Sequence, residues 1–299
     1  MNIRITAVIP EAGGHAMRME QIIIRSKNAD YQKLEVLKAN RNKRHRYGEF
    51  LVEGVRNINQ AQQNGWEFSA FLSAQNRTLS GWAGEKLGTV KAARHYLLME
   101  PLMNELSGKE DSSELMAIVK MREDRPEKLS FSENPMLALF DRPSNKGNLG
   151  TMLRSCDALG VEGLLLTGHG VDPYDPDVIS SSMGSFFKVP FARLKSSRSV
   201  EGFIRTLKTQ YPAFRVFGTT AHSKNRIFEE NLSGPLLFMI GNETEGLSHH
   251  LSTICDSLLS IPMNRFSTAS SFNVSCAGTV LFYEAMRQRF DADLQASDS

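Results

Sequence analysis

The sequence has few cysteines, and they form neither a metal-site pattern nor a disulfide framework. Its 299 residues include Cys156, Cys255 and Cys276, with no Cys-x-x-Cys pair. An odd number at such wide spacing argues against a structural zinc site and against the disulfides of small secreted domains. We therefore expect no metal, and the cysteine content fits a protein of the reducing cytoplasm.

Long apolar runs are also missing. The longest unbroken runs are five residues, as at Met136–Phe140 and Leu236–Ile240, whereas a membrane-spanning helix needs about eighteen apolar residues. We therefore expect no membrane segment. The short apolar stretch within residues 1–19 lacks the long apolar region of a secretory signal, so we predict a flexible extension there.

Two glycine-rich nucleotide-binding motifs are absent. No Gly-x-Gly-x-x-Gly follows a predicted strand, and no Gly-x-x-x-x-Gly-Lys-Ser/Thr occurs. A dinucleotide-binding Rossmann unit and a P-loop NTPase are therefore disfavoured. An oxidoreductase on a doubly wound sheet stays open as an alternative, and a nicotinamide titration would exclude it.

The charge is nearly balanced overall but uneven along the chain. Lys and Arg number 35 against 33 Asp and Glu, giving a formal net charge of +2. Residues 25–56 nevertheless hold nine Lys or Arg and only four acids. Such a cluster is typical of a phosphate-binding face, although a solvated surface has the same composition.

A charged stretch divides the chain into two α/β regions. Residues 122–134 hold seven charged residues and Pro126 without a periodic apolar pattern, which predicts a linker. Strands at 50–52, 68–72 and 115–119, with helices at 55–63 and 95–106, predict a small α/β domain before the linker. Apolar strands at 137–140, 163–166, 214–217, 236–240 and 258–261, with helices at 149–159, 200–209 and 273–289, predict a mostly parallel sheet after it. The predicted organisation is an extension over 1–19, domains over 20–122 and 134–290, a linker over 123–133 and a polar tail over 291–299.

Two loops at the carboxyl ends of these strands carry polar residues suited to a ligand. After strand 137–140, Asn148 stands at the expected start of a helix, and Arg154 lies six residues later. After strand 236–240, Gly241 allows a close backbone approach and Glu243 places a carboxylate at the strand end. Each loop alone also fits an ordinary helix cap with surface side chains.

A third loop follows strand 258–261 and leads into the C-terminal helix. Ser271 and Asn273 stand at the helix N-terminus, where free N–H groups suit an anion or a polar ligand edge. A plain helix cap explains this loop equally well when it is taken alone. The three loops become informative through their order.

In that order, the loops resemble the three motifs of the SpoU (TrmH-type) family of RNA ribose 2'-O-methyltransferases. The matching segments are Asn148-Leu-Gly-Thr-Met-Leu-Arg154, Ile240-Gly-Asn-Glu-Thr-Glu-Gly-Leu247, and Ile261-Pro-Met with Ser271-Phe-Asn-Val-Ser275. The first domain is similar to the small ribosomal-protein-like RNA-binding module that often precedes this catalytic domain. The resemblance implies a SPOUT fold with a deep trefoil knot, S-adenosylmethionine as the cofactor, and a homodimer whose active site draws on both subunits.

The resemblance also assigns site residues. It implies catalytic roles for Asn148, Arg154, Glu243, Ser271 and Asn273, and cofactor contacts from Gly241, Ile261 and Phe272. Because a guanidinium normally stays charged, we expect Arg154 to grip the substrate phosphate and stabilise the developing alkoxide rather than act as a base. This chain departs from the family at Phe272, where leucine is usual, and in the loop over 261–271, which is about two residues longer.

The implied substrate is RNA, bound in part by the basic cluster Arg41, Lys43, Arg44 and Arg46. The separate N-terminal module indicates ribosomal RNA, by analogy with other members. The alternatives are a tRNA 2'-O-methyltransferase, a non-catalytic RNA-binding protein and a knotted enzyme that methylates a base. A pure binder has no need for Arg154, Glu243 and Asn273 together, and the third motif resembles the ribose-modifying group.

Overall fold

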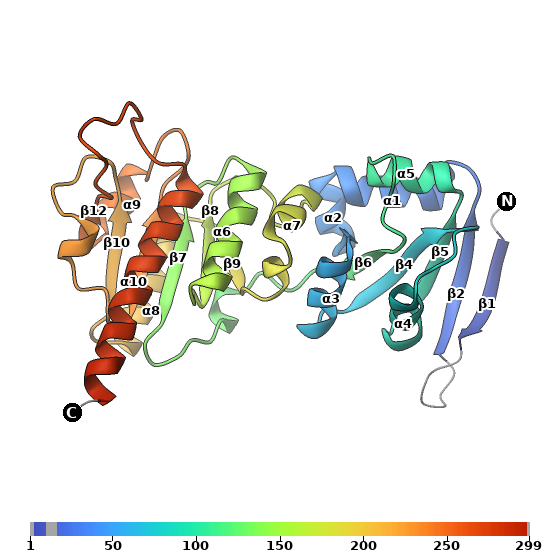
Figure 1. Cartoon of the computed structure of the whole chain (residues 1–299), viewed down its shortest axis with the longest axis horizontal. Helices are drawn as coiled ribbons and strands as arrows, with labels where there is room; N and C mark the ends of the chain where they lie inside the picture. The colour runs from blue at the N-terminus through green and yellow to red at the C-terminus, as the bar shows by residue number, and fades with distance from the viewer. Residues whose placement is uncertain (1–2, 10–16, 298–299) are drawn as a thin grey trace. The chain divides into compact units, whose positions relative to one another are not determined.

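The computed structural model describes residues 3–9 and 17–297, and these residues form two compact units (Figure 1). The first unit comprises Met1–Arg122 and Tyr174–Phe187, and the second comprises Glu123–Pro173 and Lys188–Ser299. The predicted second domain, 134–290, therefore contains a segment that groups with the first unit. Residues 123–133, the predicted linker, group with the second unit.

The first unit is a mixed sheet covered by helices. Among the described residues its strands are β1 (Ile3–Ile9), β2 (Met17–Ile24), β3 (Glu49–Glu53), β4 (Phe68–Ala74), β5 (Arg94–Leu98) and β6 (Met116–Lys120), in the order β1-β2-β5-β4-β6-β3. Its helices are α1 (Ala29–Ala39), α2 (Arg41–Tyr47), α3 (Val55–Gln63), α4 (Gly81–Thr89), α5 (Glu100–Ser107) and α7 (Pro176–Ser182), with the 3-10 turn η2 (Ser185–Phe187). Apolar residues of α1 and α5, such as Leu34 and Met103, pack on one face of this sheet.

Two predictions for the first unit are wrong. Residues 3–9 form strand β1, which pairs antiparallel with β2 along its whole length, so residues 1–19 are not simply an extension. Pairing with β2 satisfies backbone groups that an isolated segment would leave to water. Residues 1–2 and 10–16 lie outside the described residues. The helix predicted over 95–106 is a strand followed by a helix, because Pro101 fits the first turn of α5 and the preceding residues pair with β4.

The segment Tyr174–Phe187 completes an aromatic cluster of the first unit. The ring of Phe50 on β3 lies 5.0 Å from the ring of Tyr174, and the rings of Phe186 and Phe187 lie 5.0 Å apart. The indole N–H of Trp66 donates to the Phe187 carbonyl at 2.9 Å. Buried aromatic side chains contribute strongly to a core, so this unit depends on residues from two separate stretches of the chain.

The second unit confirms the predicted α/β class with a parallel sheet. Its described strands are β7 (Met136–Phe140), β8 (Gly163–Thr167), β9 (Phe191–Leu194), β10 (Arg215–Thr219), β11 (Leu236–Ile240) and β12 (Ser257–Leu259), in the order β12-β10-β11-β7-β8-β9. Every pairing between them is parallel. The sequence did not predict β9, because this edge strand buries only alternate residues and lacks a continuous apolar run.

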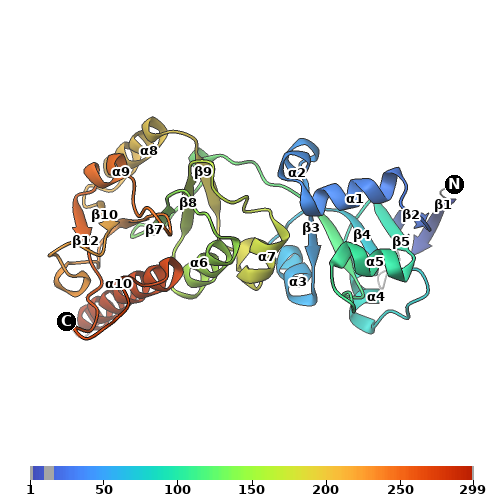
Figure 2. The same cartoon turned by 90° about the horizontal axis from the view of Figure 1, so that it is seen from above.

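Helices cover both faces of the second sheet. The helices are α6 (Lys146–Ala158), α8 (Ser197–Gln210), α9 (His249–Thr253) and α10 (Val274–Ser297), with the 3-10 turns η1 (Pro126–Lys128) and η3 (Ile227–Glu229). Figure 2 shows α6 and α10 on one side of the sheet and α8 and α9 on the other. Helix α10 continues through residues 291–297 of the predicted tail, and residues 298–299 lie outside the described part. None of the helices in the described ranges has the length and apolar character that crossing a membrane requires.

A buried histidine lies in the sheet of the first unit. His95 on β5 is 3% exposed, and its Nε2 lies 2.9 Å from the Ser73 hydroxyl. Within the described chain, its Nδ1 has no hydrogen-bond partner. Burial lowers the pKa of His95 to about 4, because the protonated ring would lose its hydration.

We predict that the stability of the first unit falls as the pH decreases from about 6.5 to about 4. In this window the unfolded chain binds a proton at His95 and the folded chain does not. The free energy of unfolding is therefore lower by about 2 kcal/mol at pH 5 than at pH 7. Urea unfolding followed by tryptophan fluorescence measures this, because both tryptophans, Trp66 and Trp82, lie in this unit. His95→Gln should lose this part of the pH dependence, whereas the exposed control His222→Gln should keep it. Equal pH dependence in all three proteins would contradict the assignment.

Candidate active site

The sheet brings the first two loops together. Strands β7 and β11 are neighbours, and their last residues, Phe140 and Ile240, are paired in register. The loop after β7 leads into α6, and the loop after β11 spans residues 241–248. Because both strands end at the same level of one edge, the polar residues that follow them face a common space.

The carboxylate of Glu243 accepts hydrogen bonds from the loop after β7. One oxygen, Oε2, accepts from the backbone N–H and the hydroxyl of Ser144, at 3.0 and 2.7 Å. The other, Oε1, accepts from the Asn145 backbone N–H at 3.0 Å and from Nδ2 of Asn148 at 3.2 Å. Burial acts to raise the pKa of Glu243, but these hydrogen bonds outweigh it and lower the pKa below its usual value. Glu243 is therefore a charged acceptor near neutral pH.

Asn148 links this carboxylate to the third loop. Its Oδ1 accepts a hydrogen bond from Nδ2 of Asn273 at 3.0 Å, and its backbone carbonyl accepts from the Ser275 hydroxyl at 2.8 Å. The Oδ1 of Asn273 in turn accepts from the Ser275 backbone N–H at 2.9 Å, at the start of α10. Glu243, Asn148 and Asn273 thus form a hydrogen-bonded array at the ends of α6 and α10, and we call these three residues the polar array.

The sequence did not identify the residue that caps α6. We expected Asn148 at the helix start, but the N-cap is Asn145, whose side chain accepts from the Asn148 backbone N–H at 3.0 Å. Asn148 is therefore the third residue of the helix, and its side chain is available for the polar array. Ser144, Asn145 and Ser275 were also missed as parts of the site. The spacing Asn145-x-x-Asn148 is the signal that could have indicated a cap followed by a site residue.

Other predicted site residues lie outside the polar array. Arg154 is exposed on α6, and its side chain makes no hydrogen bond or ion pair with any described residue. Ser271 is exposed in the loop before α10, and Phe272 beside it is 43% exposed. Ile261 is half-buried where the same loop leaves β12.

Gly241 is required by the loop that it begins. A Cβ at this position would overlap the backbone of Gly246 and Leu247. The loop closes on itself there, because the N–H groups of Asn242 and Gly246 donate to each other's carbonyls at 2.9 and 3.0 Å. The close approach seen at this glycine is that of the chain's own backbone, and a contact of Gly241 with a ligand stays a prediction.

One of the predicted RNA-binding residues is buried. Arg44 on α2 is 1% exposed, and its guanidinium donates to the carbonyls of Leu37 and Lys38 at 3.2 and 2.8 Å. It also pairs with Asp175, in the segment that belongs to the same unit, at 3.3 Å. The prediction that Arg44 binds RNA is therefore wrong, since its charge is used inside the fold. Arg46 is exposed, and Arg41 and Lys43 are half-buried.

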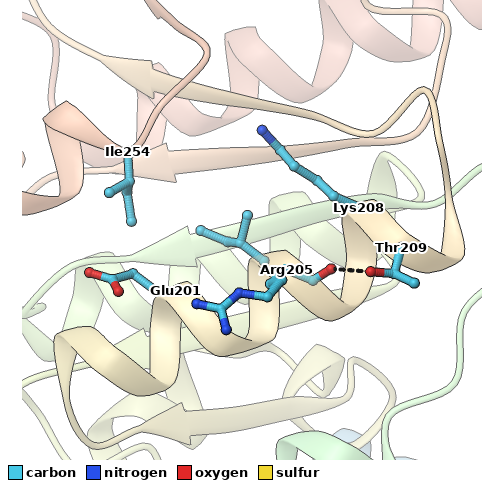
Figure 3. Close-up of a pocket in the computed structure, with 6 residues that line it drawn as sticks. Glu201, Arg205, Lys208, Thr209 and Ile254 are labelled. Atoms are coloured by element: carbon cyan, nitrogen blue, oxygen red, sulfur yellow. Dashed lines mark hydrogen bonds between the residues drawn. The ribbon is translucent and has the colours of Figure 1, made fainter.

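A shallow pocket of about 410 Å³ lies on the side of the second sheet that α8 and α9 cover (Figure 3). Helix α8 supplies most of its lining, including Glu201, Arg205 and Lys208. Lys208 is already paired with Asp256 at 2.6 Å, and the hydroxyl of Thr209 donates to the Arg205 carbonyl at 2.9 Å. This pocket contains no residue of the polar array. In the described ranges there is also no group of three or more His, Cys, Asp or Glu residues that could hold a metal ion.

Comparison with known families identifies both regions of the chain. Residues 135–283 match the SpoU rRNA methylase family, and residues 28–117 match the SpoU L30e-like domain. A 23S rRNA (uridine(2479)-2'-O)-methyltransferase of Streptomyces viridochromogenes is 40% identical over 266 residues, which is 89% of this chain and 92% of that protein. The 23S rRNA (guanosine-2'-O-)-methyltransferase RlmB of Vibrio parahaemolyticus is 32% identical over 165 residues, covering 55% of this chain and 64% of RlmB.

Solved structures give the same result. The SpoU methyltransferase AviRb from S. viridochromogenes, crystallised in complex with AdoMet, superposes with a TM-score of 0.83 at 40% identity, over 88% of this chain and 98% of AviRb. An AdoMet-bound rRNA methyltransferase from Sinorhizobium meliloti has a TM-score of 0.77 at 23% identity, over 89% of this chain and 98% of that one. The second likeness supports the fold alone.

We predict that Arg44→Leu destabilises the first unit by about 3 kcal/mol, because it leaves Asp175 without its buried cation and two carbonyls without donors. Arg46→Leu, on the same helix but exposed, should change the stability by less than about 0.5 kcal/mol. Denaturant unfolding monitored by tryptophan fluorescence gives both values. Arg44→Met combined with Asp175→Asn should recover part of the loss. Equal effects of the two leucine variants would show that Arg44 is not buried as described.

Proposed function

The chain belongs to the SpoU rRNA methylase family, and from this premise we propose that it transfers a methyl group from S-adenosylmethionine to a ribose 2'-hydroxyl of 23S rRNA. The observation that carries the proposal is the polar array at the carboxyl edge of the parallel sheet. It unites residues from all three motifs in a chain that is 40% identical, along 89% of its length, to a named 23S rRNA 2'-O-methyltransferase. The two relatives named above as 23S rRNA 2'-O-methyltransferases differ in the base but share the ribose position and the RNA, so ribose methylation of 23S rRNA is their common chemistry.

The residues present fit the cofactor. Residues 264–273 of the third loop are exposed, and they carry the rings of Phe266 and Phe272, which are 76% and 43% exposed. An apolar ring beside exposed backbone suits the flat, polar-edged adenine of S-adenosylmethionine. We propose that Gly241, Ile261 and Phe272 hold the cofactor through backbone and apolar contacts. When bound, it supplies the electrophilic methyl group.

Glu243 acts as an orienting group in this proposal. A carboxylate offers about four lone-pair sites, and the hydrogen bonds from Ser144, Asn145 and Asn148 occupy both of its oxygens. A carboxylate so engaged, with a lowered pKa, is poorly suited to take the proton of the ribose hydroxyl. Its charge instead fixes the amide of Asn148, whose orientation fixes that of Asn273. Each amide then has one N–H left to orient the ribose, and we propose that Ser271 adds its hydroxyl beside them.

Arg154 completes the site from a second subunit. It lies six residues after Asn148, about 9 Å along α6, and its side chain makes no hydrogen bond or ion pair within the described part of its own chain. Helix α10, which packs beside α6, exposes Val280, Tyr283 and Phe290. Their spacing of three and seven residues places them along one stripe, which suits an isologous interface. We therefore propose a homodimer in which the partner's Arg154 grips the substrate phosphate and stabilises the alkoxide.

The first unit selects the RNA in this proposal. Its L30e-like match and the surface of α2 support a role for Arg41, Lys43 and Arg46 in binding phosphates. We propose a cytoplasmic location because its ribosomal substrate is found there. The deep trefoil knot and the tRNA alternative stay predictions that a topological analysis and a substrate comparison would decide.

We predict that the purified protein methylates one ribose of 23S rRNA. A 2'-O-methyl group removes the nucleophile of alkaline cleavage, so the modified RNA should show one protected position on an alkaline ladder. Transcripts of 23S rRNA incubated with labelled S-adenosylmethionine should carry the label on a nucleoside ribose after complete digestion, and tRNA should serve as the comparison substrate. Label recovered on a free base would overturn the ribose assignment, and preferential labelling of tRNA would overturn the choice of RNA.

We predict that Arg154→Ala lowers methyl transfer by at least about a hundredfold while cofactor affinity stays within a few-fold, because the guanidinium acts on the RNA. Arg198→Ala, at an exposed arginine of the same unit, should have no such effect. Glu243→Gln should lower methyl transfer by a similar factor, to a residual rate that is still measurable. If the site is shared between subunits, a mixture of these two impaired proteins should regain activity.

In a mixed dimer of Arg154→Ala and Glu243→Gln subunits, one site combines the intact residues of both. Since half of the dimers in an equal mixture are mixed, and each has one intact site, coexpression should restore about a quarter of wild-type activity. No recovery, with mixed dimers demonstrated by two affinity tags, would place Arg154 in the site of its own subunit.

A further inference from the structure

Arg142, in the loop between β7 and α6, adopts a backbone conformation that side chains disfavour. In the part of the chain that the structure describes, Arg142 and Met183 are the residues other than glycine with a positive φ, at 50° and 52°. This region is costly for a residue with a Cβ, and such residues persist where the surroundings hold them. The contacts of Arg142 show what holds it.

Arg142 joins the loop after β7 to the loop after β11. Its guanidinium forms an ion pair with Glu245 and donates from Nη2 to the Gly246 carbonyl at 3.3 Å. Its own backbone carbonyl accepts from Nδ2 of Asn242 at 2.7 Å. The two attachments lie on either side of Glu243 along the chain. The carboxylate that organises the polar array is therefore held between two points fixed by Arg142.

Asp141 anchors Arg142 from behind. The Asp141 carboxylate is buried, and it accepts from Nε of Arg142 at 3.2 Å, from the Thr167 hydroxyl at 2.5 Å and from the Ser248 backbone N–H at 3.0 Å. Gly168 makes room for the arginine, since a Cβ there would lie 2.6 Å from the Arg142 Cγ. The side chain of Arg142 is thus placed by buried neighbours although it reaches the surface.

We propose that Arg142 is a positioning residue, which sets the loop over residues 242–246 so that Glu243 meets its donors at the start of α6. The positive φ allows the carbonyl and the guanidinium of Arg142 to reach the same loop. The donors Ser144 and Asn145 follow two and three residues later, so Arg142 controls both partners of the carboxylate. This inference rests on the proposed function for its consequence in catalysis, while the alignment itself is a property of the free protein.

The decisive variants remove the side-chain contacts of Arg142 and keep its backbone conformation. Asparagine tolerates a positive φ better than most residues, so Arg142→Asn should fold normally. Met183→Asn is the matched control, because it makes the same kind of change at the other positive φ. We expect Arg142→Asn to lower kcat at least about tenfold with KM for S-adenosylmethionine changed less than threefold, and its midpoint of thermal unfolding to stay within about 3 °C of wild type. Arg142→Lys should be intermediate, because an ammonium can pair with Glu245 but cannot reach the Gly246 carbonyl and Asp141 as well.

A double-mutant cycle separates positioning from a merely structural role. If Arg142 acts through Glu243, then Arg142→Asn should cost less than about twofold in kcat when Glu243 is already glutamine. If the loss of kcat in the double variant equals the product of the losses in the two single variants, the proposal is overturned. An unchanged kcat in Arg142→Asn alone would also overturn it.

A measurement without substrate keeps the inference distinct from the proposed function. Carboxyl ¹³C shifts, titrated by NMR, should give a higher pKa for Glu243 in Arg142→Asn than in wild type, because misaligned donors stabilise the charged carboxylate less. Met183→Asn should leave that pKa unchanged. If the wild type methylates no RNA but the shift is seen, the proposed function fails and the positioning role stands. An unshifted Glu243 would overturn the positioning role whatever the activity.

Discussion

The carboxylate of Glu243 is the acceptor around which the start of α6 is organised. Its oxygens accept hydrogen bonds from Ser144, Asn145 and Asn148, so one side chain of the loop after β11 satisfies all of these donors. This arrangement requires two strands that end at the same level, which the parallel pairing of β7 with β11 provides. It also requires an ionised carboxylate, because a protonated one would present a donor where a donor already lies. The sheet and the charge together decide where the amides of the site point.

The sequence predicted the features of the second unit that depend on continuous burial. Strands β7, β8 and β11 are buried along their whole length, so their apolar runs indicated a parallel sheet. Strand β9 escaped notice because an edge strand needs only alternate apolar residues. The motifs likewise pointed to Glu243, Asn148 and Asn273, which the structure joins by hydrogen bonds. Their joining depends on strand ends that lie far apart in sequence, so spacing alone could not establish it.

What the sequence could not predict depends on environment rather than on residue type. Arg44 stands among other basic residues in a short helix, and composition gives no sign that it is buried against Asp175, which lies far along the chain. Asn145 and Asn148 are the same residue three positions apart, yet one caps the helix and the other enters the polar array. Arg44 differs from its basic neighbours, and Asn148 from Asn145, through a partner that lies far away in the sequence. Only the folded chain brings that partner close.

The path of the chain between the units has a consequence for how such proteins are recombined. Because Tyr174–Phe187 belongs with the first unit, the chain passes from one unit to the other at 122–123, again at 173–174 and again at 187–188. A gene fusion with one junction would carry the strands of the first unit away from the aromatic residues Tyr174, Phe186 and Phe187 that fill its core. An exchange of RNA-recognition modules between relatives therefore has to move two pieces of sequence together, or rebuild that aromatic face in the new host.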